Sequence, residues 1–234
     1  TKSGQEGKNT ISLSSQFGIT QPLRHLKSVS SYMYGTIYNE AMQTDNPGIP
    51  ESSLKFSQFV LDAFKNHSDP IMFPDMDWDD YIFKDYAWQT QQNLSMSGGN
   101  ERFKYFLSLG YLHQDGIMNQ FDMNYNSNYT YNRYNYRANV DIAATRTTNI
   151  HVGLGGRVGV THEPQTYNIW ENIMWCTPFS SAGIVDGHYI LSSKGNNKYI
   201  PIEPGLDGLA LFYNWGYTEN TSNVLNLDVS VAQN

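Results

Sequence analysis

One short segment carries several carboxylates, the side chains that most often bind cations or transfer protons. Aspartates occupy positions 75, 77, 79 and 80, and aspartates at alternate positions can converge their oxygens on calcium. The calcium loop of an EF-hand needs glycine at its sixth position and glutamate at its twelfth. This sequence has Asp80 and Tyr86 there. The segment therefore fails as an EF-hand, and we expect a polar loop, with a looser cation contact as the alternative.

The other residues that could do chemistry lack the spacing for it. Paired carboxylates could serve glycoside hydrolysis, but no spacing fixes two of the available acids at a catalytic separation. These acids lie in or beside predicted loops: Asp79, Asp80, Asp115, Asp122 and Glu163. The histidines are scattered, and the single cysteine, Cys176, adds no zinc-ligand pair. We therefore predict no enzyme activity, no catalytic residue, no cofactor and no metal site.

Glycines gather at positions 153, 155, 156 and 159. A dinucleotide-binding fingerprint requires Gly-x-Gly-x-x-Gly at the start of a helix. A fingerprint begun at Gly153 meets Val158 at its last position, inside a predicted strand. We expect these glycines to relieve crowding or to let a strand bend.

Aromatic residues crowd the last long loop, and we take four of them as candidates for substrate contact: Trp170, Trp175, Tyr213 and Trp215. Rings with an apolar body and a polar tip can stack on a sugar or a peptide at the mouth of a binding site. In the alternative interpretation the loop packs on itself or contacts a covering protein. We favour this alternative, so the four residues stand only as candidates.

Composition limits the class of protein. Charged residues make up 16% of the 234 residues, below the roughly 25% of ordinary soluble domains, whereas aromatic residues reach 14%. The net charge is −7, and lysines and arginines form no cluster along the sequence, which argues against a nucleic-acid partner. Because the chain begins at Thr1 without methionine or a signal peptide, we expect a piece of a longer protein.

Alternation of apolar and polar residues is the clearest structural signal. Tyr134, Ala138 and Val140 fall on one face of a strand, and Arg137 and Asp141 fall on the other. A period of two is the mark of a strand that separates two environments. Six segments show it, roughly residues 10–20, 88–97, 102–113, 133–143, 149–161 and 223–232. Most of them run about 9–14 residues, longer than ordinary strands and close to strands that cross a bilayer at a tilt.

Short and long connections alternate between these strands. Residues 97–101 and 144–149 form short turns, whereas residues 21–87, 114–132 and 162–222 form long connections. Short turns at one rim and long loops at the other are typical of outer-membrane barrels, in which the long loops are extracellular.

Helical periodicity appears in the first long connection. Apolar residues spaced by three and four predict two amphipathic helices, at about residues 24–43 and 51–66. Leu26, Val29 and Ile37 belong to the apolar stripe of the first helix. Pro50 and the serines that follow it supply a start signal for the second.

Several segments resemble the SusC/RagA type of TonB-linked outer-membrane protein, and they come in that family's order. They are residues 1–8 (TKSGQEGK), like the end of the plug domain; 11–18 (ISLSSQFG), like the first barrel strand; 77–83 (DWDDYIF), like the Asp-Trp motif; 94–99 (LSMSGG), like a strand-to-turn signature; 105–111 (YFLSLGY) with 114–117 (QDGI), like the next strand and its exit; and 133–140 (RYNYRANV), like a further strand. The ordered set makes the resemblance specific.

The resemblance implies a fold and a function. Family members have a plug inside an antiparallel transmembrane β-barrel of about 22 strands. They import oligosaccharides or peptides with energy relayed by TonB, and a SusD-like surface lipoprotein covers the extracellular mouth. This chain would then be an all-β piece of such a barrel in the bacterial outer membrane. Residues 1–9 would be the end of the plug or a linker, and residues 10–234 would form about six strands with long extracellular loops, the first containing short helices.

A soluble all-β carbohydrate-binding module is the alternative that the alternation alone permits. The two readings differ in what covers the apolar strand faces. A sandwich buries them between two sheets, whereas a barrel exposes them to lipid as a band about 25 Å tall, with its polar faces toward the lumen.

Overall fold

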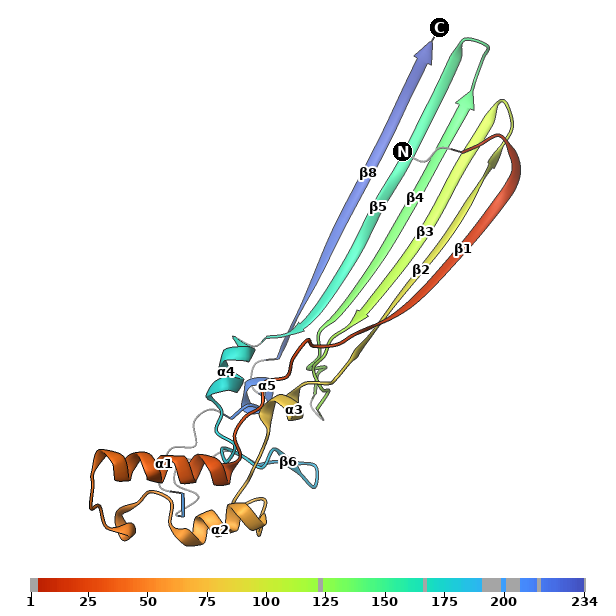
Figure 1. Ribbon diagram of the computed structural model, residues 1–234. Helices are drawn as coiled ribbons and strands as arrows, with labels where there is room; N and C mark the ends of the chain where they lie inside the picture. The colour runs from red at the N-terminus through yellow and green to blue at the C-terminus, as the bar shows by residue number, and fades with distance from the viewer. Residues whose placement is uncertain are drawn as a thin grey trace.

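The computed structural model describes residues 4–121, 124–165, 168–190, 199–200, 207–213 and 216–233. Six long strands form one antiparallel sheet in chain order, β1-β2-β3-β4-β5-β8. Their bounds are Gly7–Thr20 (β1), Ala87–Gly99 (β2), Phe103–Asp115 (β3), Thr130–Ala143 (β4), Thr148–Pro164 (β5) and Tyr217–Gln233 (β8). The sheet extends as a long blade from a group of helices at one end (Figure 1).

All residues of the six predicted strand ranges except residue 102 lie within the observed strands. The observed strands are longer than the predicted ranges. The alternation locates β8 from residue 223, whereas β8 begins at Tyr217. Its first residues are polar on both faces, so the hydrophobic pattern cannot mark them, although they pair with the end of β5. At the other end of the chain, residues 7–9, which the prediction placed in a linker, belong to β1.

Tight turns join the strands at the end of the sheet far from the helices (Figure 1). In the β2–β3 turn, the Asn100 side chain accepts hydrogen bonds from the backbone N–H groups of Arg102 and Phe103, both at 2.9 Å. Gly99 precedes it with a φ of +149°, a backbone conformation that glycine tolerates best. A short turn between these strands is therefore confirmed, but it lies at residues 100–102, because residues 97–99, which the prediction placed in the turn, belong to β2.

The described residues of the three long connections, within 21–86, 116–129 and 165–216, gather at the other end of the sheet, and we call them the head. Its elements are α1 (Ser31–Asp45), the 3-10 helix η1 (Glu51–Ser53), α2 (Gln58–Asn66), α3 (Trp78–Ile82), α4 (Ile169–Trp175), a small hairpin of β6 (Ile184–Val185) and β7 (His188–Tyr189), and α5 (Ala210–Tyr213).

The head has its own hydrophobic cores. One surrounds Trp78 and draws on all three connections, since Met118 and Leu209 pack in the same cluster. The other surrounds Phe56 and includes Phe179 from the third connection. Loops that are far apart in the sequence thus share buried side chains, and we expect the head to fold as one packed unit.

Both predicted helices of the first connection need correction. The first begins at Ser31 rather than near residue 24, because the Ser30 hydroxyl caps it by accepting from the Met33 N–H. The second is split into η1 and α2. Helix α2 starts after Ser57, whose side chain accepts from the Val60 N–H, and not at Pro50.

The apolar stripe of α1 faces outward, which is the opposite of what an amphipathic helix predicts. Ile37 is 53% exposed, while Gly35 and Asn39 are buried. A Cβ atom at Gly35 would meet Leu61 Cδ2 at 2.8 Å, so the helix packs closely through its small residue. Asn39 compensates for its burial by hydrogen bonding both the N–H and the carbonyl of Phe56.

The sheet is open in the described part of the chain, since the outer edges of β1 and β8 pair with no further strand there. A closed barrel of about 22 strands therefore stays a prediction. Among the described residues, no helix is long and apolar enough to cross a membrane.

Candidate functional site

One face of the sheet, which we call the apolar face, presents aliphatic side chains on all six strands. It includes Ile11, Leu13, Leu94, Leu107, Leu109, Val140, Leu154, Leu225, Leu227 and Val229. Leu13 is 74% exposed and Leu227 is 69% exposed. No second sheet packs on this face in the described residues. The sandwich expected for a soluble module is therefore not formed by this part of the chain.

The head-side boundary of the apolar face differs between strands, and on β5 it extends to Val160, which lies level with His113 of β3. The face continues to Ile19 on β1 but stops at Leu225 on β8. In the register of the sheet, Ile19 lies about level with Asp115 of β3, and Leu225 lies level with Leu109. The apolar face thus ends at different levels on different strands.

Tyrosines mark this boundary in the middle of the sheet. Tyr111 and Tyr134 are cross-strand partners whose rings stack with centroids 5.1 Å apart. The next pair toward the head is polar, and His113 Nδ1 and Asn132 Oδ1 lie 2.8 Å apart. The Tyr111 hydroxyl donates to the same Asn132 oxygen at 3.0 Å. Paired rings between an apolar band and a polar rim resemble the aromatic girdle of membrane barrels.

The opposite face of the sheet, which we call the polar face, carries amides, hydroxyls and charges, among them Gln89, Gln91, Asn93, Ser108, Arg137, Asn139, Asp141, Arg157, Asn226 and Asp228. A groove of about 1060 Å³ runs over β3, β4, β5 and β8 on this side. Arg137, Arg157 and Asp228 contribute to its lining. Such a surface can hold a polar ligand through many hydrogen bonds.

An ionic cluster joins three strands of the polar face near the tight turns. His151 Nδ1 lies 2.6 Å from Asp141 Oδ1, and His151 Nε2 lies 3.7 Å from Asp228 Oδ1. The cluster links β4, β5 and β8 across the face. We assign it a structural role, because each of these groups already faces an opposite or hydrogen-bonding partner.

The four loop aromatics proposed for substrate contact do not form a common site in the described residues. Trp170 of α4 stacks on Phe83 with centroids 4.3 Å apart, so it packs against the head itself. Trp175 is 68% exposed. Tyr213 ends α5, but its side chain lies outside the described part, as does Trp215 altogether. Substrate contact by these residues stays a prediction.

The aspartates at positions 75 to 80 organise the head. Asp77 caps α3 by accepting from the N–H groups of Asp79 and Asp80. Asp75 accepts from the Ser31 N–H at 2.6 Å and so ties the start of α1 to this segment. Aspartates just before a helix commonly accept hydrogen bonds from its first backbone N–H groups in this way.

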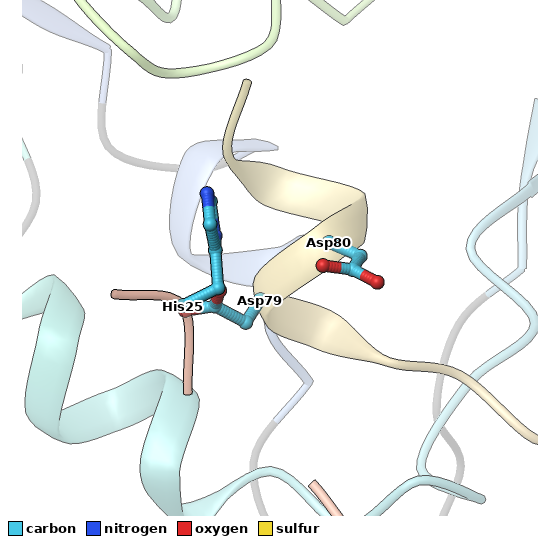
Figure 2. A group of neighbouring side chains, drawn as sticks. All are labelled: His25, Asp79 and Asp80. Atoms are coloured by element: carbon cyan, nitrogen blue, oxygen red, sulfur yellow. The ribbon is translucent and has the colours of Figure 1, made fainter. Parts of the chain in front are cut away.

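A candidate cation contact exists on the same turn, where ligand atoms of His25, Asp79 and Asp80 lie within 4.8 Å of one another (Figure 2). Asp79 is buried, and its Oδ2 lies only 2.6 Å from His25 Nδ1. The histidine thus already supplies the partner that a buried carboxylate requires. This pair fixes the segment between β1 and α1 onto α3, and we take it as a structural tie.

Cys176 is the one thiol of the chain, and it is buried at the end of α4. Burial, reinforced by the negative charge of Asp207, raises the pKa of the thiol to about 12. Since the thiolate is the reactive form, the thiol stays neutral and inert at pH 8.

We expect alkylation of Cys176 in the folded protein to be at least about 100-fold slower than for a free cysteine. Peptide mass spectrometry of iodoacetamide-treated folded and urea-unfolded samples checks this, and equal rates in both samples would contradict it.

No protein-family model matches the chain, and no curated protein matches it. Among solved structures, a chain of the RagAB peptide importer in the "closed-closed" state is similar over 100% of this chain and 27% of its own length, with a TM-score of 0.61 and 16% identity. Chains of the RagAB peptide transporter and of the importer in the "open-open" state are similar over 69% of this chain and 19% of theirs, with TM-scores of 0.49 and 0.47 and identities of 21% and 20%. The match at 0.61 shows a shared fold, and this chain spans about a quarter of the chain it matches.

Sequence reasoning missed one feature of the polar face, a group of three arginines, Arg133, Arg137 and Arg157. The alternation already places all three on the polar side of their strands. Their proximity depends on the pairing of β4 with β5, in which Arg157 lies opposite Asn135. That register is the signal that the sequence alone did not supply.

Proposed function

We propose that this chain forms part of the barrel wall of a TonB-linked, SusC-type importer in the bacterial outer membrane. The observation that carries the proposal is the exposed apolar face with tyrosines at its boundary, because an apolar band flanked by aromatic residues matches the lipid-facing surface of an outer-membrane barrel. The polar face then lines the lumen. Residues before β1 form the end of the plug or a linker. The two edges of the sheet join the rest of the barrel, since open edges are not stable in hydrocarbon.

The substrate is a peptide or an oligosaccharide that passes through the lumen, and no chemical step is assigned to the chain. The fold similarity supports this proposal, because the matched structure is named as a peptide importer. The extended polar face supports it as well, since it offers hydrogen-bonding side chains along most of the strand length. The energy for import comes from TonB through parts of the protein outside this sequence.

A SusD-like lipoprotein is the proposed partner, and it sits over the head. The head presents exposed apolar side chains that its own cores do not use: Met33 and Ile37 lie one turn apart on α1, and Leu26 and Val29 precede the helix, all between 43% and 53% exposed. Apolar side chains gathered on one surface are a common feature of protein interfaces. The head lies where the long loops of outer-membrane barrels are extracellular, so a surface lipoprotein can reach it.

Uptake by intact cells tests the proposed function. Cells that make the complete protein with its neighbouring lipoprotein take up labelled oligopeptides or oligosaccharides, and we expect uptake to stop when TonB is deleted. The matched control is a strain that makes the lipoprotein but not this protein. The proposal would be contradicted if the control cells took up both substrate classes as fast as the cells that make the protein. Uptake that continues after TonB is deleted would also contradict it.

A further inference from the structure

Three of the six arginines in the chain meet on the polar face. Arg157 of β5 lies directly opposite Asn135, and Arg133 and Arg137 lie two residues to either side of Asn135 on β4. Diagonal neighbours across an antiparallel pair are about 7–8 Å apart. The long side chain of Arg157 therefore lies within reach of both other guanidinium groups, and we call the three residues the arginine cluster.

The charges on the polar face are segregated along the strands. Toward the tight turns, Lys104 lies opposite Asp141, and Asp141 and Asp228 flank His151, so the cation there faces a carboxylate. The arginine cluster has no such balance, because no described carboxylate forms an ion pair with any of its three members. Three adjacent cations repel one another, and this arrangement favours an anion as partner.

The cluster is open to a ligand. Arg137 and Arg157 are exposed and line the groove of about 1060 Å³ on the polar face. The Nε atom of Arg133 is buried and has no hydrogen-bond partner among the described residues. The cluster lies level with Tyr134 and Tyr136, at the end of the polar face nearer the head, which is where a substrate arriving through the head would first meet the lumen.

Gly155 keeps the groove open beside the cluster. A Cβ atom at Gly155 would meet only Tyr136 O at 3.8 Å and Arg137 Nε at 4.0 Å, and the residue has no left-handed backbone angle. Neither crowding nor backbone strain therefore requires glycine here. A side chain at position 155 would instead fill the groove next to Arg137.

We propose that the arginine cluster binds the carboxylate groups of an anionic oligomeric substrate in this groove. This inference rests on the proposed importer function and deepens it by naming the charge of the substrate. A guanidinium group binds a carboxylate through two parallel N–H···O bonds, and those of Arg137 and Arg157 in the groove, beside the positive charge of Arg133, suit a chain that carries several carboxylates. A glutamate-containing peptide and a uronic-acid oligosaccharide both supply this chemistry.

Binding to the complete transporter with its lipoprotein partner tests the inference. The probes are a labelled glutamate-containing peptide and its glutamine counterpart, and a labelled oligogalacturonate and a neutral oligosaccharide of equal length. We expect at least one acidic probe to bind more tightly than its neutral counterpart, with an affinity that falls as salt rises. The double variant Arg137→Gln, Arg157→Gln is expected to weaken binding of that probe about tenfold or more and to leave its neutral counterpart within about twofold. The probe that responds identifies the source of the carboxylates.

Three further variants separate charge, shape and folding. Arg137→Lys with Arg157→Lys keeps the charge and is expected to retain part of the preference for the acidic probe. Gly155→Leu fills the groove and is expected to weaken both members of the responding pair. Arg146→Gln, in the β4–β5 turn, is the matched control and is expected to change nothing. Heat-modifiable migration of each variant on gels reports whether the barrel has folded.

The outcomes distinguish this inference from the importer function. If the wild-type transporter binds neutral probes as well as acidic ones, and the glutamine variant behaves in the same way, the importer stands and the arginine inference is wrong. An equal loss of acidic and neutral binding in the folded glutamine variant also overturns it. If the wild type binds none of the four probes, both proposals fail.

Discussion

Replacing Leu107 by arginine is expected to destabilise the folded barrel by about 2–4 kcal/mol in a bilayer, whereas Ser108→Arg is expected to cost less than about 1 kcal/mol, through repulsion from Arg137 opposite it. Leu107 lies on the apolar face, level with Ala138, Leu154 and Leu227, in the middle of the aliphatic band. A charged side chain there would sit near the bilayer midplane, where its desolvation is most costly. Ser108, one residue further along the same strand, points to the polar face and would place arginine in the aqueous lumen.

Urea titration of the complete protein in lipid vesicles measures this difference, with tryptophan fluorescence and heat-modifiable migration as readouts. The two variants carry the same new side chain on adjacent residues of β3, so helix or strand propensity cannot explain a difference between them. Equal loss of stability in both variants, or a larger loss for Ser108→Arg, would contradict the assignment of the apolar face to lipid.

Trp78→Ala is expected to destabilise the head by about 3–5 kcal/mol. Trp78 is 2% exposed and packs in the cluster with Ile82, Leu209 and Phe212. Its indole N–H donates to the Thr177 carbonyl at 3.0 Å. The substitution leaves a cavity where all three long connections meet and removes one of the hydrogen bonds that join the first connection to the third.

Trp175→Ala is the matched control, because Trp175 is 68% exposed, and we expect its effect on stability to stay within about 0.5 kcal/mol. Hydrogen exchange of the head peptides, compared with strand peptides of the same sample, separates local opening from barrel unfolding. Unchanged protection of the α3 and α5 peptides in Trp78→Ala would show that the head does not depend on this core.

The strands could be predicted from the sequence because their signal is local. A period of two marks a strand wherever its two faces meet different environments, and all six segments with that pattern became strands of one sheet. The pattern failed only where both faces meet polar surroundings, as at the start of β8. The sheet is not closed among the described residues, so a closed barrel stays a prediction.

The head could be predicted less well because its determinants are contacts between distant residues. Spacing located helices near α1 and α2, yet the side of α1 that is buried is chosen by the bonds of Asn39 to Phe56 and by the close approach of Gly35 to Leu61. Helices α3, α4 and α5 are short, with few periodic positions. Without their partners across the head, they cannot be told from loops.

The candidate site shows the same division. The aspartate-rich segment carried a possible cation contact as a sequence pattern, and in the structure most of its carboxylates cap helices or pair with His25. The arginine cluster was readable as three residues on polar strand faces, but only the β4–β5 register brings them together. The face of a strand on which a side chain lies could be predicted from the sequence. The side chains that it meets on the neighbouring strand could not.

In the proposed barrel wall, the apolar face meets lipid and the polar face meets water. Spin labels placed one at a time along β8 of the complete protein in outer-membrane vesicles test it, with collision rates measured against oxygen and against a water-soluble nickel chelate. Labels at Leu225, Leu227, Val229 and Val231 are predicted to collide more with oxygen, and labels at Asn226, Asp228 and Ser230 more with the chelate. An alternation of the opposite phase, or equal access of the chelate to all seven positions, would contradict the barrel-wall assignment.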